Sequence, residues 1–378
     1  MGQTLFDRLW DEHRVESLDD GTDLIYIDRI FLHERTGSIA LTSLEADGRE
    51  VFCPEQVFCC MDHIVDTFPG RTDETTMPSG RDFIVATRSA VERAGITLFD
   101  LGDPREGIVH VVSAEQGIVQ PGVTLVCPDS HTCTQGAFGA LAWGIGSSEA
   151  EHALCTKTLR VRRPQTMRVR FDGELPAGVT AKDLILHLIG THGASGGSGY
   201  AIEFCGKAIE ALSMEARMTL CNMAVEFSAF TGLIAPDEKA IEYMHGRPFA
   251  PAGEDWAAAE AYWRTLRSAD DAVFDREITV DCNTLEPCVT WGTSPEHTAF
   301  ISGSVPEDAA DSAAGERALA HMDMAPGQTL LGTPIDAAFI GSCTNSRLSD
   351  LRRAAELLRG RRVAEGVKAI CVPGSMQV

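Results

Sequence analysis

The chain contains no C-x-x-C pair, although it has twelve cysteines in 378 residues. The nearest approaches to such a pair are Cys59-Cys60, Cys127 with Cys133, and Cys282 with Cys288. None of these has the spacing of a structural zinc site. The cysteines are also too dilute for a disulfide scaffold. We therefore expect most of them to be reduced thiols in the core.

Long apolar runs are missing as well. No segment approaches the roughly 20 apolar residues that a membrane-spanning helix needs. The first six residues, Met-Gly-Gln-Thr-Leu-Phe, lack the basic and apolar regions of a signal peptide. These absences predict a soluble, cytoplasmic protein without a membrane partner.

Basic residues are few relative to acidic ones. There are 32 Lys and Arg against 55 Asp and Glu, which gives a formal net charge of −23. Because nucleic acid is a polyanion, this balance excludes it as a favoured partner. The hydrophobic content of 44% and the charged content of 23% are ordinary for a globular protein. A chain of this length should form two or three domains.

One segment near the end of the chain combines a short apolar run with a polar loop. Residues 337–347 read Ala-Ala-Phe-Ile-Gly-Ser-Cys-Thr-Asn-Ser-Arg. A helix-periodic stretch follows up to Gly360, and 367–372 reads as a second strand. Cys343 then lies just beyond the carboxyl end of a strand, where open parallel sheets bind ligands. We expect backbone N–H groups and Arg347 to lower its pKa and favour the thiolate. The alternative is a small buried thiol.

A similar arrangement occurs earlier in the chain. Val123–Cys127 reads as a strand, and Pro-Asp-Ser-His-Thr follows at 128–132. Three consecutive residues do not form a serine-hydrolase triad, and the G-x-S-x-G motif is absent. Residues 136–146 are rich in glycine and alanine. We expect a helix there, with the glycines marking a close approach of the backbone to a neighbouring element or a ligand.

Three further sites carry candidate residues. Asp62-His63 follows an apolar pair, and His110 lies in an expected apolar strand at 107–112. His110 alone is more simply explained as a hydrogen-bonded core histidine. Asn222 and Glu226 are four residues apart and would share one face of a helix. Their apolar neighbours suggest burial, so the carboxylate needs a partner such as a histidine.

Other segments give a coarse outline of the fold. We expect capped helices after Thr4 and Thr180, a strand from Asp23 to Leu32, and a strand from Met167 to Phe171. Helices are expected at 82–95 and 256–267. The glycine-rich segment 190–199 lacks the Walker pattern, so we interpret it as a turn or flexible loop.

Several of these motifs together resemble the aconitase superfamily. The resemblance rests on Cys-Pro-Asp-Ser-His-Thr at 127–132, Cys-Asn-Met at 221–223 with Glu226, and Gly-Ser-Cys-Thr-Asn-Ser-Arg at 341–347. Asp62-His63, residues 107–110 and residues 289–293 support it. Each motif alone is weak, but their order is specific and covers essentially the whole chain. Within the superfamily the chain is most similar to the family of 3-isopropylmalate dehydratase large subunits.

The resemblance implies an α/β fold with three domains and mostly parallel central sheets around a cluster cleft. The expected domains are 1–164, 165–280 and an incomplete third domain at 281–378. It also implies a [4Fe–4S] cluster held by three cysteines, with Cys343 as one metal ligand. The other two cysteines belong to a C-x-x-C motif that this sequence does not contain. We therefore expect a carboxy-terminal truncation and little activity from this chain alone.

The resemblance also assigns roles to residues. The catalytic acid–histidine pairs would be Asp62 with His63, Asp129 with His110, and Glu226 with His131. Such pairs hold an imidazole in its protonated form, so that it can protonate a departing hydroxide. The residues expected to contact the substrate or shape the cluster loop are Ser130, Asn222, Thr344, Asn345, Ser346 and Arg347.

The implied reaction is the reversible dehydration of 3-isopropylmalate to 2-isopropylmaleate and its rehydration to 2-isopropylmalate, in leucine biosynthesis. The iron of the cluster would act as a Lewis acid on the hydroxyl. The implied partners are a hydroxy-dicarboxylate substrate and a small subunit with a swivelling domain and the catalytic serine. Ile64-Val65 and Cys133 are not the commonest family residues, so 2-methylmalate, 2,3-dimethylmalate and homoaconitate remain alternative substrates. A different class, an RNA-binding regulator, is disfavoured by the negative charge.

Overall fold

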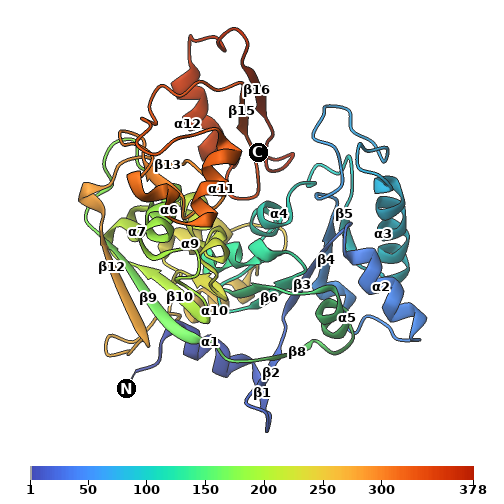
Figure 1. The fold of residues 1–378 in the computed structure, drawn as a ribbon. Coiled ribbons are helices and arrows are strands. Elements are labelled where there is room, and N and C mark those ends of the chain that lie inside the picture. Colours follow the sequence, from blue (N-terminus) through green and yellow to red (C-terminus); the bar gives the residue numbers. More distant parts are fainter. Residues whose placement is uncertain (1) are drawn as a thin grey trace.

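The first of two large sheets organises the amino-terminal half of the chain (Figure 1). The computed structural model describes residues 2–378. The sheet is entirely parallel, in the order β5-β4-β3-β6-β7. Its strands are β3 (Arg29–His33), β4 (Val57–Cys60), β5 (Thr97–Phe99), β6 (Thr124–Cys127) and β7 (Leu141–Gly144). After β3 the chain adds β4 and then β5 on one side of that strand. It then crosses over and adds β6 and β7 on the other side, so the strand order reverses between β3 and β6. Ligands bind at such a switch point, outside the carboxyl ends of the strands.

Helices and a small antiparallel sheet surround this first sheet. The helices are α1 (Leu5–His13), α2 (Gly37–Ala46), α3 (Gly80–Ala94), α4 (Val109–Glu115) and α5 (Ser147–Thr156), with 3₁₀ turns η1 (Pro54–Gln56) and η2 (Ser130–Phe138). The small sheet contains β1 (Arg14–Ser17), β2 (Asp23–Tyr26) and β8 (Thr158–Val161). The predicted cap of the first helix is confirmed, because the Thr4 and Asp7 side chains form a reciprocal capping box.

The second large sheet is also parallel, in the order β11-β10-β9-β12. Its strands are β9 (Gln165–Asp172), β10 (Tyr200–Cys205), β11 (Thr231–Leu233) and β12 (Arg276–Asp281). The accompanying helices are α6 (Ala181–His192), α7 (Lys207–Ala211), α8 (Met214–Asn222), α9 (Glu238–Met244) and α10 (Glu254–Trp263), with η3 (Val225–Phe227) and η4 (Cys282–Thr284). The predicted capping box at Thr180 and Asp183 is confirmed.

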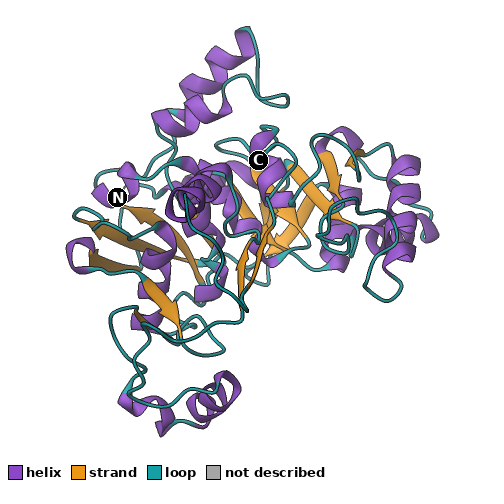
Figure 2. Cartoon of the chain, turned by 90° about the horizontal axis from the view of Figure 1, so that it is seen from above, coloured by secondary structure: helices purple, strands orange, loops and turns teal. Residues whose placement is uncertain are grey.

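The two large sheets share one hydrophobic core. Buried side chains of both sheets, such as Leu141 and Leu233, belong to the same cluster. At this junction Gly136 passes so close to Gly232 that a Cβ on Gly136 would lie 1.8 Å from the Gly232 carbonyl oxygen. Only glycine fits there. The expected close approach of the glycine-rich segment is therefore to a neighbouring strand. Seen from above in Figure 2, strands run through the middle of the molecule and helices lie around them.

The carboxy-terminal part contains smaller units. An antiparallel pair, β13 (Cys288–Thr290) and β14 (Thr298–Phe300), precedes η5 (Glu307–Asp311) and α11 (Ala313–Met322). The last unit is β15 (Ala337–Ile340), α12 (Leu348–Leu358) and β16 (Lys368–Cys371), with the two strands parallel. The strand–loop–helix–strand unit predicted for this segment is confirmed. No helix within residues 2–378 has both the length and the apolar character to cross a bilayer.

Several sequence predictions of local structure are wrong. Residues 107–112 do not form a strand, because α4 begins at Val109, whose N–H donates to the Asp62 carboxylate. A fully buried apolar run fits a strand or a helix equally well, so its periodicity could not separate the two. Asp23–Leu32 forms two strands in different sheets, β2 and β3.

The glycine-rich segment and the Asn222 region also differ from expectation. Residues 136–146 are the end of η2 and strand β7, separated by Gly139 with a φ of +74°. Helix α8 ends at Asn222, and Glu226 belongs to the separate turn η3. The two side chains therefore do not share one helical face.

Candidate active site

The acid–histidine residues lie at the carboxyl edge of the first large sheet. Asp62 and His63 follow β4, whereas Asp129 and His131 follow β6. Strand β3 lies between β4 and β6, and parallel strands present their carboxyl ends at the same edge. The site therefore forms at the switch point of the sheet.

Asp129 is the centre of this group. Its Oδ2 lies 2.9 Å from His63 Nε2, and its Oδ1 lies 3.0 Å from His110 Nε2. Oδ1 also accepts the backbone N–H of His131 at 2.7 Å. Burial disfavours the charge of this carboxylate, but His110 and His63 hold the pKa of Asp129 well below its usual range. One ionised carboxylate thus joins three histidines from separate loops and a helix.

His63 lies between two carboxylates. Its Nδ1 is 2.7 Å from Asp62 Oδ1, while its Nε2 faces Asp129. Asp62 is itself held by the N–H of Val109, which donates to Oδ2 at 2.8 Å. Burial opposes the charged ring, but the Asp62 carboxylate and the hydrogen bond to Asp129 raise the pKa of His63 to about 11. His63 is therefore an imidazolium at neutral pH.

The third pair joins the two large sheets. His131 Nε2 lies 3.1 Å from Glu226 Oε1 in η3. Ser130 is exposed, and its Oγ is 3.2 Å from His131 Nδ1. All three expected acid–histidine pairs are thus in contact. The sequence had not indicated the additional contact between His63 and Asp129.

The loop that carries Cys343 is attached to α8 through Asn222. The buried Asn222 donates from Nδ2 to Cys343 Sγ at 3.5 Å and to Thr134 Oγ1 at 2.8 Å. Its Oδ1 accepts from Thr344 Oγ1 at 2.8 Å. One amide therefore connects η2, α8 and the cysteine loop. Such a buried amide is fixed in place because all its polar atoms are satisfied.

Arg347 holds the shape of the same loop. Its buried guanidinium donates to the carbonyl oxygens of Thr344 at 2.8 Å and Cys343 at 3.1 Å. Asn345 Nδ2 donates to Asp350 Oδ1 at 3.2 Å. Ser346 is buried, and its backbone has a φ of +73°. The four residues Thr344–Arg347 therefore shape the loop around Cys343.

The predicted lowering of the Cys343 pKa is wrong. Burial raises the pKa of this thiol, although the Asn222 hydrogen bond and the Arg347 charge oppose the shift. Arg347 donates to the carbonyl oxygens of Thr344 and Cys343 rather than to the Cys343 sulfur.

The cysteines fit only part of a cluster site. Within residues 2–378, one set of side chains has enough metal-ligand atoms within 4.8 Å of one another to hold a metal ion, and Cys343 is not among its four members. Cys133 is buried against the Asn222 carbonyl, and burial raises its pKa to about 12. Cys371 is exposed at the end of β16. The described residues therefore provide no set of three cysteines that converge on one metal site.

The sequence predictions missed Glu34 and His33. His33 is the last residue of β3 and Glu34 follows it directly, at the switch point, so this pair carries the same strand-then-polar-loop signal as Asp62 and Asp129. Glu34 accepts hydrogen bonds from the backbone at 62–64, and the His33 ring stacks on His63 with centroids 3.7 Å apart.

Comparison with known proteins identifies the family. The model of the aconitase family (aconitate hydratase) matches residues 7–378. The chain is 52% identical over 382 residues to 3-isopropylmalate dehydratase large subunit 1 of Bradyrhizobium diazoefficiens. The match covers 100% of this chain and 80% of that relative. The two parallel sheets agree with the expected α/β fold. The chain belongs to the aconitase family.

Proposed function

We propose that this chain is the large subunit of a 3-isopropylmalate dehydratase. It would catalyse the dehydration of 3-isopropylmalate to 2-isopropylmaleate and the rehydration to 2-isopropylmalate. The observation that carries the proposal is the contact of Asp129 with three histidines beside the Cys343 loop. The relative with 52% identity supports the choice of substrate. The expected location is the cytoplasm, in the leucine pathway.

The histidines would donate a proton to the departing hydroxide, so that it leaves as water. His63 is held as an imidazolium between Asp62 and Asp129, so it keeps a proton at the site at neutral pH. We assign proton donation to His63, His110 and His131 as a set. Asp62, Asp129 and Glu226 would orient these rings.

The cofactor is an iron–sulfur cluster, as membership of the family implies. We propose the [4Fe–4S] type, with Cys343 as one thiolate ligand. The amide of Asn222 would then face the cluster, because it already donates to Cys343 Sγ. The remaining ligands are not provided by a converging set within residues 2–378, so we derive no catalytic step through the cluster.

A small subunit is the proposed partner. The carboxylates of Asp62, Asp129 and Glu226 each already contact an imidazole. A base that removes the carbon-bound proton would therefore come from elsewhere, and we propose the serine of the small subunit. Ser130 and residues 344–347 would bind the hydroxy-dicarboxylate or shape its site.

We also propose that segments 1–164, 165–280 and 281–378 correspond to three domains.

The test is turnover by the reconstituted two-subunit enzyme. Because residues 2–378 hold no three-cysteine set, the chain would be joined to a segment that supplies a C-x-x-C pair and co-expressed with the small subunit. The complex would be treated anaerobically with iron and sulfide and assayed by the absorbance of the unsaturated product. 2-Methylmalate, 2,3-dimethylmalate and homoaconitate would be assayed beside 3-isopropylmalate. We expect the highest kcat/KM with 3-isopropylmalate and loss of bound iron in Cys343→Ser. Preferred turnover of another acid would contradict the substrate assignment. Full iron content without any turnover would contradict the function.

A further inference from the structure

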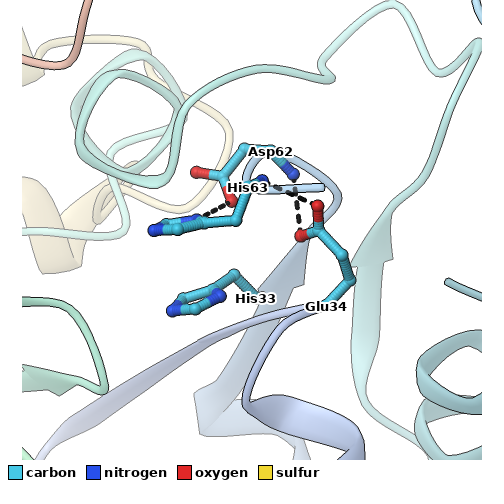
Figure 3. A group of neighbouring side chains, drawn as sticks. All are labelled: His33, Glu34, Asp62 and His63. Carbon is cyan, nitrogen blue, oxygen red and sulfur yellow. Dashed lines mark hydrogen bonds and ion pairs between the residues drawn. The ribbon is translucent and has the colours of Figure 1, made fainter. Parts of the chain in front are cut away.

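Glu34 is a buried carboxylate that accepts three consecutive backbone N–H groups. Its Oε2 accepts from Asp62 N at 2.9 Å, and its Oε1 accepts from His63 N at 2.7 Å and from Ile64 N. The side chain is fully buried. Figure 3 shows it beneath the turn that carries Asp62 and His63. Strand pairing explains the approach, because His33 lies opposite Cys60 across β3 and β4.

This arrangement of three donors favours the ionised form of Glu34. Burial and the nearby Asp62 carboxylate raise the pKa of Glu34, whereas the N–H groups of Asp62 and Ile64 oppose that shift. Three N–H donors on two oxygens satisfy a carboxylate, but a protonated carboxyl group would set its own O–H against one of them. The charge of Glu34 is therefore used to fix the backbone of the turn.

Fixing this turn also fixes the Asp62–His63 hydrogen bond. The two side chains leave adjacent residues, and their 2.7 Å contact forms only if the backbone turns sharply between them. His33 supports the ring from below, stacked at 13°. Burial lowers the pKa of His33, so a neutral ring faces the imidazolium. The charged or titratable groups that face His63 are Asp62, Asp129, Glu34 and His33, with His110 beyond Asp129.

A metal site is the competing explanation for this cluster. The ligand atoms of His33, Glu34, Asp62 and His63 lie within 4.8 Å of one another. However, both Glu34 oxygens accept backbone N–H groups, and the two Asp62 oxygens face His63 Nδ1 and Val109 N. A cation would have to displace these donors and lie beside an imidazolium. The hydrogen bonds favour a positioning role instead.

We propose that Glu34 is a positioning residue that holds the Asp62–His63 pair in its catalytic geometry. It acts through the backbone of residues 62–64 and does not contact the substrate. The kinetic part of this proposal rests on the proposed function, whereas the effect on His63 does not. Small misplacements of catalytic groups lower rates strongly, by about 10²-fold for 1 Å.

Two variants of Glu34 and one matched control test this role. Glu34→Gln keeps the shape but places an NH₂ group against a backbone N–H, and Glu34→Asp keeps the charge but shortens the reach. Thr87→Val is the control, because Thr87 Oγ1 donates to the Glu34 carbonyl oxygen at 3.0 Å and is equally buried. This change removes the hydrogen bond to the Glu34 backbone and leaves the Glu34 carboxylate unchanged. The readouts are the NMR pKa of His63 in this chain, assigned with His63→Asn, and kcat and KM in the two-subunit enzyme.

We expect Glu34→Gln to lower the His63 pKa and to reduce kcat by about 10- to 100-fold, with a smaller change in KM. Thr87→Val should lower the melting temperature and leave both readouts near wild type. Combined with Asp62→Asn, Glu34→Gln should add little, since both act through one pair. A folded Glu34→Gln protein with a wild-type His63 pKa would overturn the proposal, and so would equal effects of Thr87→Val. If the wild-type enzyme fails to turn over 3-isopropylmalate, only the proposed function fails, because the NMR result stands independently.

Discussion

The acid–histidine group and the cysteine loop are held in different ways. Strands β4 and β6, which carry Asp62 and Asp129, are buried along their whole length. Strand β16 is exposed throughout, β15 has no buried residue, and α12 also has none. The acid–histidine geometry is therefore fixed by the hydrophobic core. The arrangement of the cysteine loop depends on a small number of polar contacts.

Those polar contacts join the loop to helix α8 and, through Gly374, to Ile108. Thr219 Oγ1 in α8 donates to the Thr344 carbonyl oxygen at 2.9 Å, and Asn222 contacts Cys343 and Thr344. On the other side, Gly374 N donates to the Ser346 carbonyl oxygen at 2.9 Å, and the Gly374 carbonyl oxygen accepts from Ile108 N at 2.8 Å. The acid–histidine group therefore depends mainly on buried strands, whereas the cysteine loop depends mainly on these hydrogen bonds.

The largest expected effect is on catalysis. Asp129→Asn removes the charge that joins His63, His110 and His131, so kcat of the reconstituted enzyme should fall by about 10²- to 10⁴-fold. Asp73→Asn is the control, since Asp73 pairs with Arg88 outside this group. Steady-state kinetics would measure both. An Asp129→Asn enzyme with nearly wild-type kcat would contradict the central position of this carboxylate.

Core and surface leucines should differ sharply in their effect on stability. Leu184 in α6 is 0% exposed, whereas Leu358 in α12 is 54% exposed. We expect Leu184→Ala to lower the free energy of unfolding by about 2–5 kcal/mol and Leu358→Ala to change it by less than about 0.5 kcal/mol. Urea unfolding of the isolated chain would measure both values. A large loss in Leu358→Ala would show that α12 is packed more tightly than its exposure indicates.

The stability contributed by His63 should depend on pH. The folded-state pKa of this histidine is raised from 6.5 to about 11. Its contribution is therefore complete below about pH 6.5 and is lost as pH rises toward 11. The difference in free energy of unfolding between wild type and His63→Gln should shrink over that range. A difference that grows between pH 7 and 10 would contradict the assigned direction.

A smaller effect is expected from loosening the cysteine loop. Thr219→Val removes the hydroxyl that donates to the Thr344 carbonyl oxygen, at a cost of about 1 kcal/mol. Thr219→Ser retains the donor and serves as the control. Hydrogen exchange of residues 342–347 should accelerate in the valine variant only. An equal acceleration around Asp62 and His63 would show that the two regions are not held independently.

The sequence predicts strand β6 correctly from its apolar run, whereas at β4 it shows only an apolar pair before Asp62-His63. The order of the strands, which brings these two segments to one edge of the sheet, is not predicted. The partners of the three histidines came from the resemblance to the family, and their roles remain predictions. The contact between His63 and Asp129 was missed, because 66 residues separate them and only the folded sheet brings them together.

The errors have physical causes as well. The position of Glu34 after β3 is visible in the sequence, but its contacts are not, because its three partners are backbone N–H groups, which every residue except proline carries. The Cys343 pKa was predicted in the wrong direction because its burial, which outweighs the Asn222 hydrogen bond and the Arg347 charge, is a property of the folded loop.

The most direct test of the preformed acid–histidine group is an NMR titration of His63 in the chain without cofactor. We predict that its ring remains an imidazolium from pH 5 through pH 9, since Asp62 and Asp129 raise its pKa to about 11. Titration near 6.5 would contradict the account. It would show that the pairs of Asp62 and Asp129 with His63 do not form until a cofactor or partner is bound.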